Sequence, residues 1–337
     1  MTERAGPDLS RFASIASAGF AVGVTLFTVL VVSLGVREIA GLVASAGVGL
    51  LWVALFHVVP IAASALGWYT IVAAVDTPRL AVVLAARWVA ESINQLLPAL
   101  HVGGNVVRAR RLGQSGVPPR LAAATVVVDI TLHLLAQLLF TMLGLSLLLT
   151  RTGASGVGRI AAGLVLAVLA AGGFYVLQRR GLFSAMTFLL GRAFRGGDWA
   201  AVSEGAGEID RWIRRLYEQR RMLAVSEVWH ALSWLLGAGE TWLALRFLGH
   251  PVGLAAALVI ESLGEAIRTA AFPVPAALGV QEGGLVLLGD LFGLTSEVSM
   301  ALSLVQRVRA LALGVPGLVF WQLGGLREAR AGAEATR

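Results

Sequence analysis

The chain has 337 residues, of which 57% are hydrophobic and only 14% charged, and its net charge at pH 7 is +7. Soluble globular proteins carry about 25% charged residues, so this composition excludes a soluble protein and indicates a multi-pass membrane protein. All basic residues are arginines, most of them at the ends of apolar runs. The positive-inside rule explains this placement without a nucleic-acid partner. The absence of cysteine excludes disulfides, thiol nucleophiles and cysteine-bound metals.

The apolar runs predict an all-α fold with about six full spans and two re-entrant hairpins. Several runs exceed the roughly 20 residues that cross a bilayer. The first run is longer than the apolar region of a signal peptide, so we expect a retained anchor and not a cleaved leader. In chain order, spans are expected near 12–35, 48–75, 118–150, 156–177, 222–247 and 296–324, and hairpins near 78–107 and 252–292.

The segment 178–221 is the main polar stretch of the chain and is rich in arginine. We expect this loop and both termini to be cytoplasmic, because positively charged loops stay on that side of the membrane. One helix is expected near 199–220. Its positive face is suited to anionic lipid, and the alternative is a solvated connector that only sets the topology.

Arginines also predict that the segment 78–107 is a hairpin and not a crossing. Arg79 lies near its start and a cluster of arginines at 108–111 follows it, so both of its ends are expected on the cytoplasmic side. Pro98 interrupts it, and proline breaks a helix. The segment 252–292 must then be a second hairpin that enters from the opposite side.

Within one integral membrane domain, residues 1–337, the segments 48–150 and 222–324 are therefore predicted to form an inverted-topology repeat. The alternative is that the two segments resemble each other by chance, because both are apolar and rich in small residues. Both segments contain a Glu-Ser pair, a proline and a Gly-Gly pair in the same order: Glu91-Ser92, Pro98 and Gly103-Gly104 in the first, and Glu261-Ser262, Pro275 and Gly283-Gly284 in the second.

Charged residues and helix breakers inside these apolar segments mark the candidate binding site. A charge near the bilayer centre costs about 2.5–3.5 kcal/mol on insertion scales, and paired broken helices in the two halves of a chain indicate a transporter's substrate site. The residues predicted to contact a polar substrate are Glu91, Asn94, Pro98, Gly103, Gly104, Asp129, Glu261, Glu265, Arg268, Pro275, Gly279, Gln281, Glu282, Gly283, Gly284, Gln306, Arg307 and Arg309.

Ion pairing within the membrane is the alternative role for these charges. Glu265 and Arg268 are three residues apart and share a helix face with Glu261. Arg307 and Arg309 are suited either to a phosphate or carboxylate headgroup or to serving as counter-ions of the glutamates. The helix that restarts near Gly279 would favour an anion at its N-terminus.

Two carboxylate–histidine pairs have a spacing that occurs in bundle metal sites. They are Asp129 with His133 and Glu227 with His230. Each helix contains only one such pair, so we expect no metal and no cofactor. Protonatable carboxylates within the spans, such as Glu91, Asp129, Glu261 and Glu265, would also permit coupling of transport to protons.

Three motifs resemble a known family. They are Phe272-Pro-Val-Pro-Ala-Ala-Leu-Gly-Val-Gln-Glu-Gly-Gly284, Leu302-Ser-Leu-Val-Gln-Arg-Val-Arg309, and Glu91-Ser-Ile-Asn-Gln-Leu-Leu-Pro98 with Gly103-Gly104. The chain is similar, over about 12–325, to the flippase-like family that shares the transmembrane region of lysylphosphatidylglycerol synthase, and most to its branch associated with hopanoid biosynthesis.

The resemblance implies a bacterial inner-membrane protein that moves lipids between leaflets. It also implies that carboxylates and arginines of the core line the path of the headgroup, here Glu91, Asp129, Glu261, Glu282, Arg307 and Arg309. The synthases carry a soluble aminoacyl-transferase domain, whereas this chain stops at Arg337. Aminoacylation is therefore not expected.

We expect a lipid transporter and not an enzyme, with a hopanoid, an isoprenoid-derived lipid or an anionic phospholipid as its cargo. One alternative is an intramembrane enzyme that modifies a lipid headgroup through Glu91, Glu261 or His101. The other is a non-transporting subunit that docks a lipid-biosynthesis enzyme through the 178–221 loop.

Single cysteines in this cysteine-free chain test the predicted topology. Cysteines replacing Gln114 and Ser203 should react with an impermeant maleimide from the cytoplasmic side. Cysteines replacing Ser155 and Ser296 should react from the outside. Labelling of positions 114 and 203 from opposite sides would show that the first hairpin crosses the membrane. The predicted inverted repeat would then be wrong.

Overall fold

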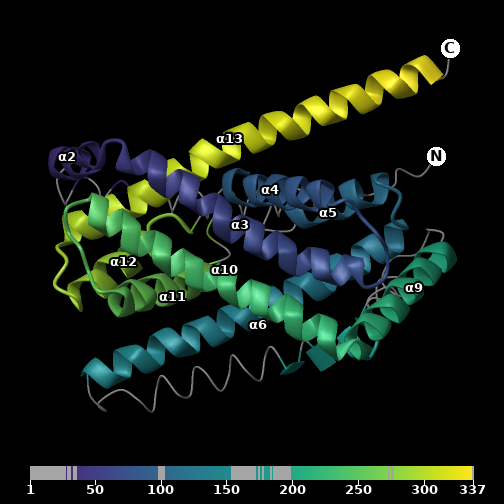
Figure 1. Cartoon of the computed structure of the whole chain (residues 1–337), viewed down its shortest axis with the longest axis horizontal. Helices are drawn as coiled ribbons and strands as arrows, with labels where there is room; N and C mark the ends of the chain where they lie inside the picture. Colours follow the sequence, from purple (N-terminus) through teal and green to yellow (C-terminus); the bar gives the residue numbers. More distant parts are fainter. Residues whose placement is uncertain are drawn as a thin grey trace, which may run out of the picture. The chain divides into compact units, whose positions relative to one another are not determined.

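The computed structural model describes residues 36–97, 103–152, 199–271 and 277–335, together with residues 28, 32, 172, 173, 175, 176, 178–182, 184 and 274. The described part is all-helical, which confirms the predicted fold class of an all-α membrane protein (Figure 1). Its helices are α2 (Val36–Ala46), α3 (Gly49–Ala73), α4 (Leu80–Leu96), α5 (Gly103–Gln114), α6 (Pro119–Thr152), α9 (Trp199–Glu218), α10 (Arg220–Phe247), α11 (Leu254–Ala270), α12 (Val280–Asp290) and α13 (Ser296–Ala335).

Three described helices are long and apolar enough to cross a membrane: α3, α6 over Pro119–Thr150, and α13 over Ser296–Gly324. They coincide with the spans expected near 48–75, 118–150 and 296–324. The helix α10 has the bounds of another expected span, but polar side chains such as His230 and Glu240 make it less apolar. The spans expected near 12–35 and 156–177 lie almost wholly outside the described residues.

Each predicted hairpin contains two helices separated by a break. The first is α4 and α5, and the second is α11 and α12, which lie side by side (Figure 1). Before α12 the backbone of Gly279 has φ 76°, a left-handed conformation that glycine adopts readily because it has no Cβ. Pro98, His101 and Pro275 lie outside the described residues.

Contacts divide the expected single domain into two compact units. The first unit comprises residues 1–57, 92–103 and 237–337, and the second comprises 58–91 and 104–236. The helices α3 and α10 each contribute one part to each unit. In the first unit, buried side chains of α2, α3, α10, α11, α12 and α13 form a single apolar core.

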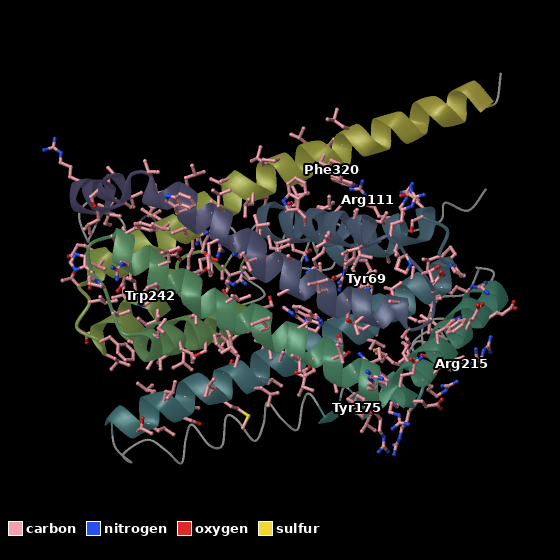
Figure 2. The ribbon with its side chains drawn as sticks, in the orientation of Figure 1. Tyr69, Arg111, Tyr175, Arg215, Trp242 and Phe320 are labelled. Atoms are coloured by element: carbon pink, nitrogen blue, oxygen red, sulfur yellow. The ribbon has the colours of Figure 1, made fainter. Side chains whose placement is uncertain are left out.

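The second unit has a core that includes α9, the helix predicted near 199–220. Ile213 and Leu216 of α9 are fully buried, and Val128 of α6 belongs to the same apolar cluster. The opposite face of α9 exposes arginines such as Arg215, which points outward in Figure 2. The predicted positive face is therefore present, and the apolar face of the helix is occupied by packing within the unit.

Adjacent glycines of α12 should respond differently to alanine. A Cβ at Gly284 would lie 2.8 Å and 3.1 Å from Ile267 of α11, whereas a Cβ at Gly283 would meet nothing within 4 Å. Overpacking costs about 1–3 kcal/mol, while alanine gains up to about 1 kcal/mol over glycine inside a helix. Gly284→Ala should lower the unfolding temperature of the purified protein in detergent, and Gly283→Ala should leave it unchanged or raise it. Equal effects of the two substitutions would contradict the observed α11–α12 packing.

Candidate functional site

A buried carboxylate, Asp129 of α6, organises the second unit. Arg108 of α5 donates to its Oδ2, Arg87 of α4 lies 3.4 Å from the same oxygen, and His230 of α10 has its Nε2 3.0 Å from Oδ1. Asp129, Arg108 and His230 are all 0% exposed. These four residues, the Asp129 cluster, connect four helices at one point.

The surroundings of the Asp129 cluster are closed by packing. The Arg108 guanidinium lies 4.9 Å from the centre of the Trp68 ring, and the Trp68 indole donates to Thr125 at 3.3 Å. A Cβ at Gly67 would lie 2.9 Å from the His230 ring. The backbone of α3 therefore approaches this ring closely at Gly67, which has no side chain. The cluster therefore has the form of an internal structural ion pair, the alternative role that the sequence analysis gives for charges such as Asp129.

The histidine pairs considered for metal meet at this cluster. Nδ1 of His133 lies 3.3 Å from Nδ1 of His230. Even so, no group of three or more His, Asp or Glu side chains within the described ranges is arranged to hold a metal ion.

A second buried ion pair lies in the first unit. Arg309 of α13 donates to Glu240 of α10, and His57 of α3 has its Nδ1 2.5 Å from the other Glu240 oxygen. This Glu240 cluster (His57, Glu240 and Arg309) contains unsatisfied atoms, as the Asp129 cluster does at Arg108 Nη2, Asp129 Oδ1 and His230 Nε2. His57 Nε2 and Arg309 Nε are buried and make no hydrogen bond within the described part of the chain. Buried polar atoms without partners cost about 1–3 kcal/mol each, so these two atoms are suited to a polar ligand.

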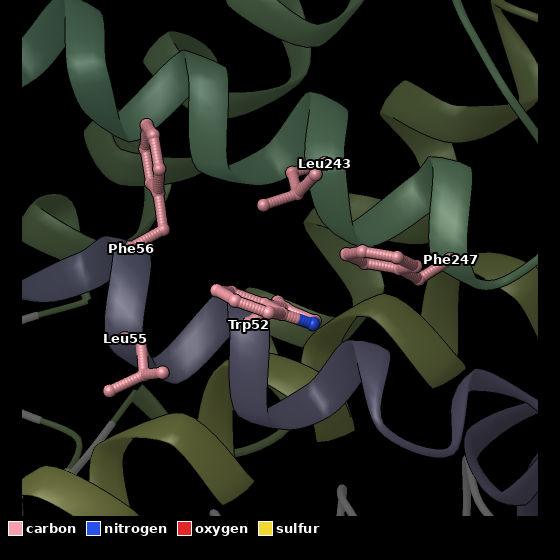
Figure 3. Close-up of a pocket in the computed structure, with 5 residues that line it drawn as sticks. All are labelled: Trp52, Leu55, Phe56, Leu243 and Phe247. Atoms are coloured by element: carbon pink, nitrogen blue, oxygen red, sulfur yellow. The ribbon is translucent and has the colours of Figure 1, made fainter.

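An apolar pocket adjoins the Glu240 cluster. Its volume is about 460 Å³, and it is lined by Trp52, Leu55 and Phe56 of α3 and by Leu243 and Phe247 of α10 (Figure 3). Phe56 directly precedes His57. On α10, Glu240, Leu243 and Phe247 follow one helix face at i, i+3 and i+7. The polar cluster and the apolar pocket are thus consecutive along the same two helices.

Glu282, which the sequence predicts to contact the substrate, makes hydrogen bonds within the protein. It is 0% exposed. Its Oε2 accepts the Gly279 N–H at 2.7 Å, and its Oε1 accepts Ser303 at 2.9 Å and the Arg307 Nε at 2.9 Å. The sequence predicts an anionic ligand at the N-terminus of α12, but an N–H group of that terminus already donates to a carboxylate of the chain. Glu282 therefore caps α12 and joins it to α13, and Arg307 is its counter-ion.

The other predicted residues divide between the two units. Glu265 and Arg268 form the expected pair, at 2.9 Å and 2.6 Å from Arg268 nitrogens to Glu265 Oε2. Gln281 of α12 donates to Gln306 of α13 at 3.0 Å. Asn94, Gly103, Glu261, Gly279, Gly283 and Gly284 also belong to the first unit, while Glu91, Gly104 and Asp129 belong to the second.

Sequence reasoning missed His57, Arg108, Glu240 and His230 as parts of these clusters. His57 and Glu240 are ionisable residues inside apolar runs, the same signal that singled out Glu261. The sequence predicts that Arg108 lies at the flank of a hairpin, because it begins an arginine cluster. Its burial depends on helix packing, which no local pattern reports.

Breaking the Asp129 cluster from one side should strongly destabilise the protein. Asp129→Asn leaves the buried Arg108 without its counter-ion, which costs about 3–5 kcal/mol in free energy of unfolding. Adding Arg108→Met to Asp129→Asn removes the orphaned charge and should restore much of that stability. Denaturant unfolding in detergent measures both effects, with the exposed Asp290→Asn as control. A loss at Asp129 no larger than at Asp290 would show that the cluster contributes little.

Comparison with known proteins identifies the family. Residues 16–317 match the family described as the lysylphosphatidylglycerol synthase TM region. The match does not separate the hopanoid-associated branch from the rest of the family. No curated protein and no solved structure matches the chain. Because the match covers most of its 337 residues, the chain is a membrane protein that belongs to the lipid-related family of the lysylphosphatidylglycerol synthase transmembrane region.

Proposed function

We propose that the protein is a flippase that moves a lipid with a polar headgroup between the leaflets of the bacterial inner membrane. A hopanoid, an isoprenoid-derived lipid and an anionic phospholipid all have the required amphipathic form. The observation that carries the proposal is the succession, along α3 and α10, of the incompletely satisfied Glu240 cluster and an apolar pocket.

This succession matches the two ends of a lipid. His57 Nε2 and Arg309 Nε offer hydrogen-bonding atoms to a headgroup, and arginine is suited to phosphate or carboxylate oxygens. The pocket beside them offers about 460 Å³ lined by aromatic and aliphatic side chains, within the usual range for small-molecule sites. Trp52 and Leu55 are more than 45% exposed on a helix apolar enough to cross the membrane, so a tail in this pocket would stay continuous with the bilayer.

Contacts between α3 and α10 favour the inverted repeat that alternating access requires. Ser233 of α10 donates to the carbonyl of Pro60 in α3, and these residues are 173 positions apart. The same spacing relates His57 to His230 and Gly67 to Glu240. His57 contacts Glu240 in the first unit, and His230 contacts Gly67 in the second. The two contacts therefore correspond to each other when each residue is replaced by its counterpart 173 positions away. This correspondence is expected if the two halves of the chain are equivalent.

In this mechanism the headgroup binds at the Glu240 cluster while the tail occupies the apolar pocket. Movement of one half of the repeat against the other then exposes the headgroup to alternate leaflets, with both termini on the cytoplasmic side. Glu282 and Arg307 maintain the start of α12 and do not bind the lipid.

Filling the apolar pocket should slow lipid transport without unfolding the protein. Leu243→Trp places a large ring among Trp52, Phe56 and Phe247. Loss of one buried apolar contact of about 1.5 kcal/mol corresponds to about a tenfold lower rate. Leu235→Trp is the matched control, because Leu235 lies on the same helix, is 45% exposed and does not line the pocket.

Proteoliposomes containing a fluorescent lipid and treated with an external quencher report this rate. The candidate lipids are compared at equal protein content. Absence of protein-dependent movement for every candidate would refute the flippase proposal. Equal rates of lipid movement for Leu243→Trp and Leu235→Trp would show that the lipid does not occupy the pocket during transport.

A further inference from the structure

Glu261 of α11 differs from the other buried acids of the first unit. Glu240 is paired with Arg309, Glu282 with Arg307, and the half-buried Glu265 with Arg268. Glu261 is only 8% exposed. Its carboxyl accepts the Thr241 hydroxyl and lies 3.4 Å from the Gln306 amide nitrogen. Both of these donors are neutral, and no arginine or histidine forms an ion pair with Glu261 within the described residues.

The charges that face Glu261 come from each helix packed around it. On its own helix, Glu265 lies one turn further on and is already bound by Arg268. On α10, Glu240 is adjacent to the donor Thr241, and on α13, Arg309 is already bound by Glu240. An ionised Glu261 would therefore add a negative charge to a group in which each cation already has a carboxylate partner. Burial of such an unpaired charge costs several kcal/mol or more, so the group neutralises instead.

The carboxyl of Glu261 packs against α10 at a glycine. A Cβ at Gly237 would lie 3.3 Å from Glu261 Oε1, so the carboxyl lies against the bare backbone of α10. Its remaining connection is through Gln306, whose carbonyl accepts the Gln281 amide at 3.0 Å. Gln281 belongs to the first turn of α12, directly after the break in the second hairpin.

We propose that Glu261 is a proton-binding site that holds a proton in the resting protein and releases it during each transport cycle. The coupling rests on the proposed flippase function, whereas the protonated resting state does not. On release, the carboxyl O–H bond breaks, the proton passes to water, and a carboxylate remains. The carboxylate is a stronger acceptor for the Gln306 amide. Reorientation of Gln306 toward it changes the Gln306–Gln281 contact at the start of α12, which links protonation to the hairpin.

Glu227 of α10 is the other carboxyl to be considered. Both of its oxygens are buried without a hydrogen-bond partner, but it belongs to the second unit and connects to no broken helix. Glu227→Gln is therefore the matched control for transport. Glu265→Gln is the matched control for spectroscopy, because Glu265 is ion-paired on the same helix as Glu261.

Infrared difference spectroscopy tests the protonated state without any lipid transport. The protein in detergent at neutral pH should show a carbonyl stretch of a protonated carboxylic acid that disappears in Glu261→Gln and persists in Glu265→Gln. Thr241→Val, which keeps the carboxyl, should shift the frequency of this band. A band unaffected by both Glu261→Gln and Thr241→Val would overturn the proton site.

Transport in proteoliposomes with an imposed pH gradient tests the coupling. The wild-type rate of fluorescent-lipid movement should depend on the gradient, and Glu227→Gln should retain that dependence. Glu261→Gln should lose it. Gradient dependence that survives in Glu261→Gln would refute coupling through this residue. Absence of lipid movement in the wild type would refute the flippase proposal and the coupling with it, while the infrared band would still decide whether Glu261 holds a proton.

Discussion

An ionised carboxylate inside an apolar helix needs a cation, and the ion pairs that join two different helices organise each unit of the protein. Lipid cannot solvate the charge, so the helices that bear the two partners are held together at that point. Arg108 and Asp129 join α5 to α6, and Arg307 and Glu282 join α12 to α13. The pairs also fix how the broken hairpins attach to the long helices, because one member of each pair lies just after a break.

The two units use this constraint differently. The Asp129 cluster is closed by Trp68 and by the tight approach of α3 at Gly67. Both clusters contain buried polar atoms without a hydrogen bond. The Glu240 cluster is in addition followed directly by an apolar pocket along α3 and α10. Unsatisfied polar atoms are tolerated where they serve binding. Because the apolar pocket adjoins the Glu240 cluster, we propose the lipid site there and assign a supporting role to the Asp129 cluster.

In the folded protein, Glu282 has a different role from the one that the sequence predicts. A Gly-rich restart of a helix inside a membrane predicts an anion at the helix N-terminus. The anion is present, but it is the carboxylate of Glu282 itself, three residues into the same helix. The motif thus builds a rigid start for α12, from which Gln281 reaches Gln306. The residues that we propose for the ligand are on α3, α10 and α13, whereas the glycine-rich motif is on α12.

Local patterns determined much of the fold. Hydrophobic length placed α3, α6 and α13 within a few residues, and glycine and proline placed the two breaks, because span length and backbone freedom depend only on nearby residues. The Glu265–Arg268 pair was predictable for the same reason. Only the tertiary structure decided that Arg309 pairs with Glu240, 69 residues away, and that Glu261 receives neutral donors. These partners depend on how helices distant in sequence pack, and several combinations of buried acids and arginines satisfy the same composition.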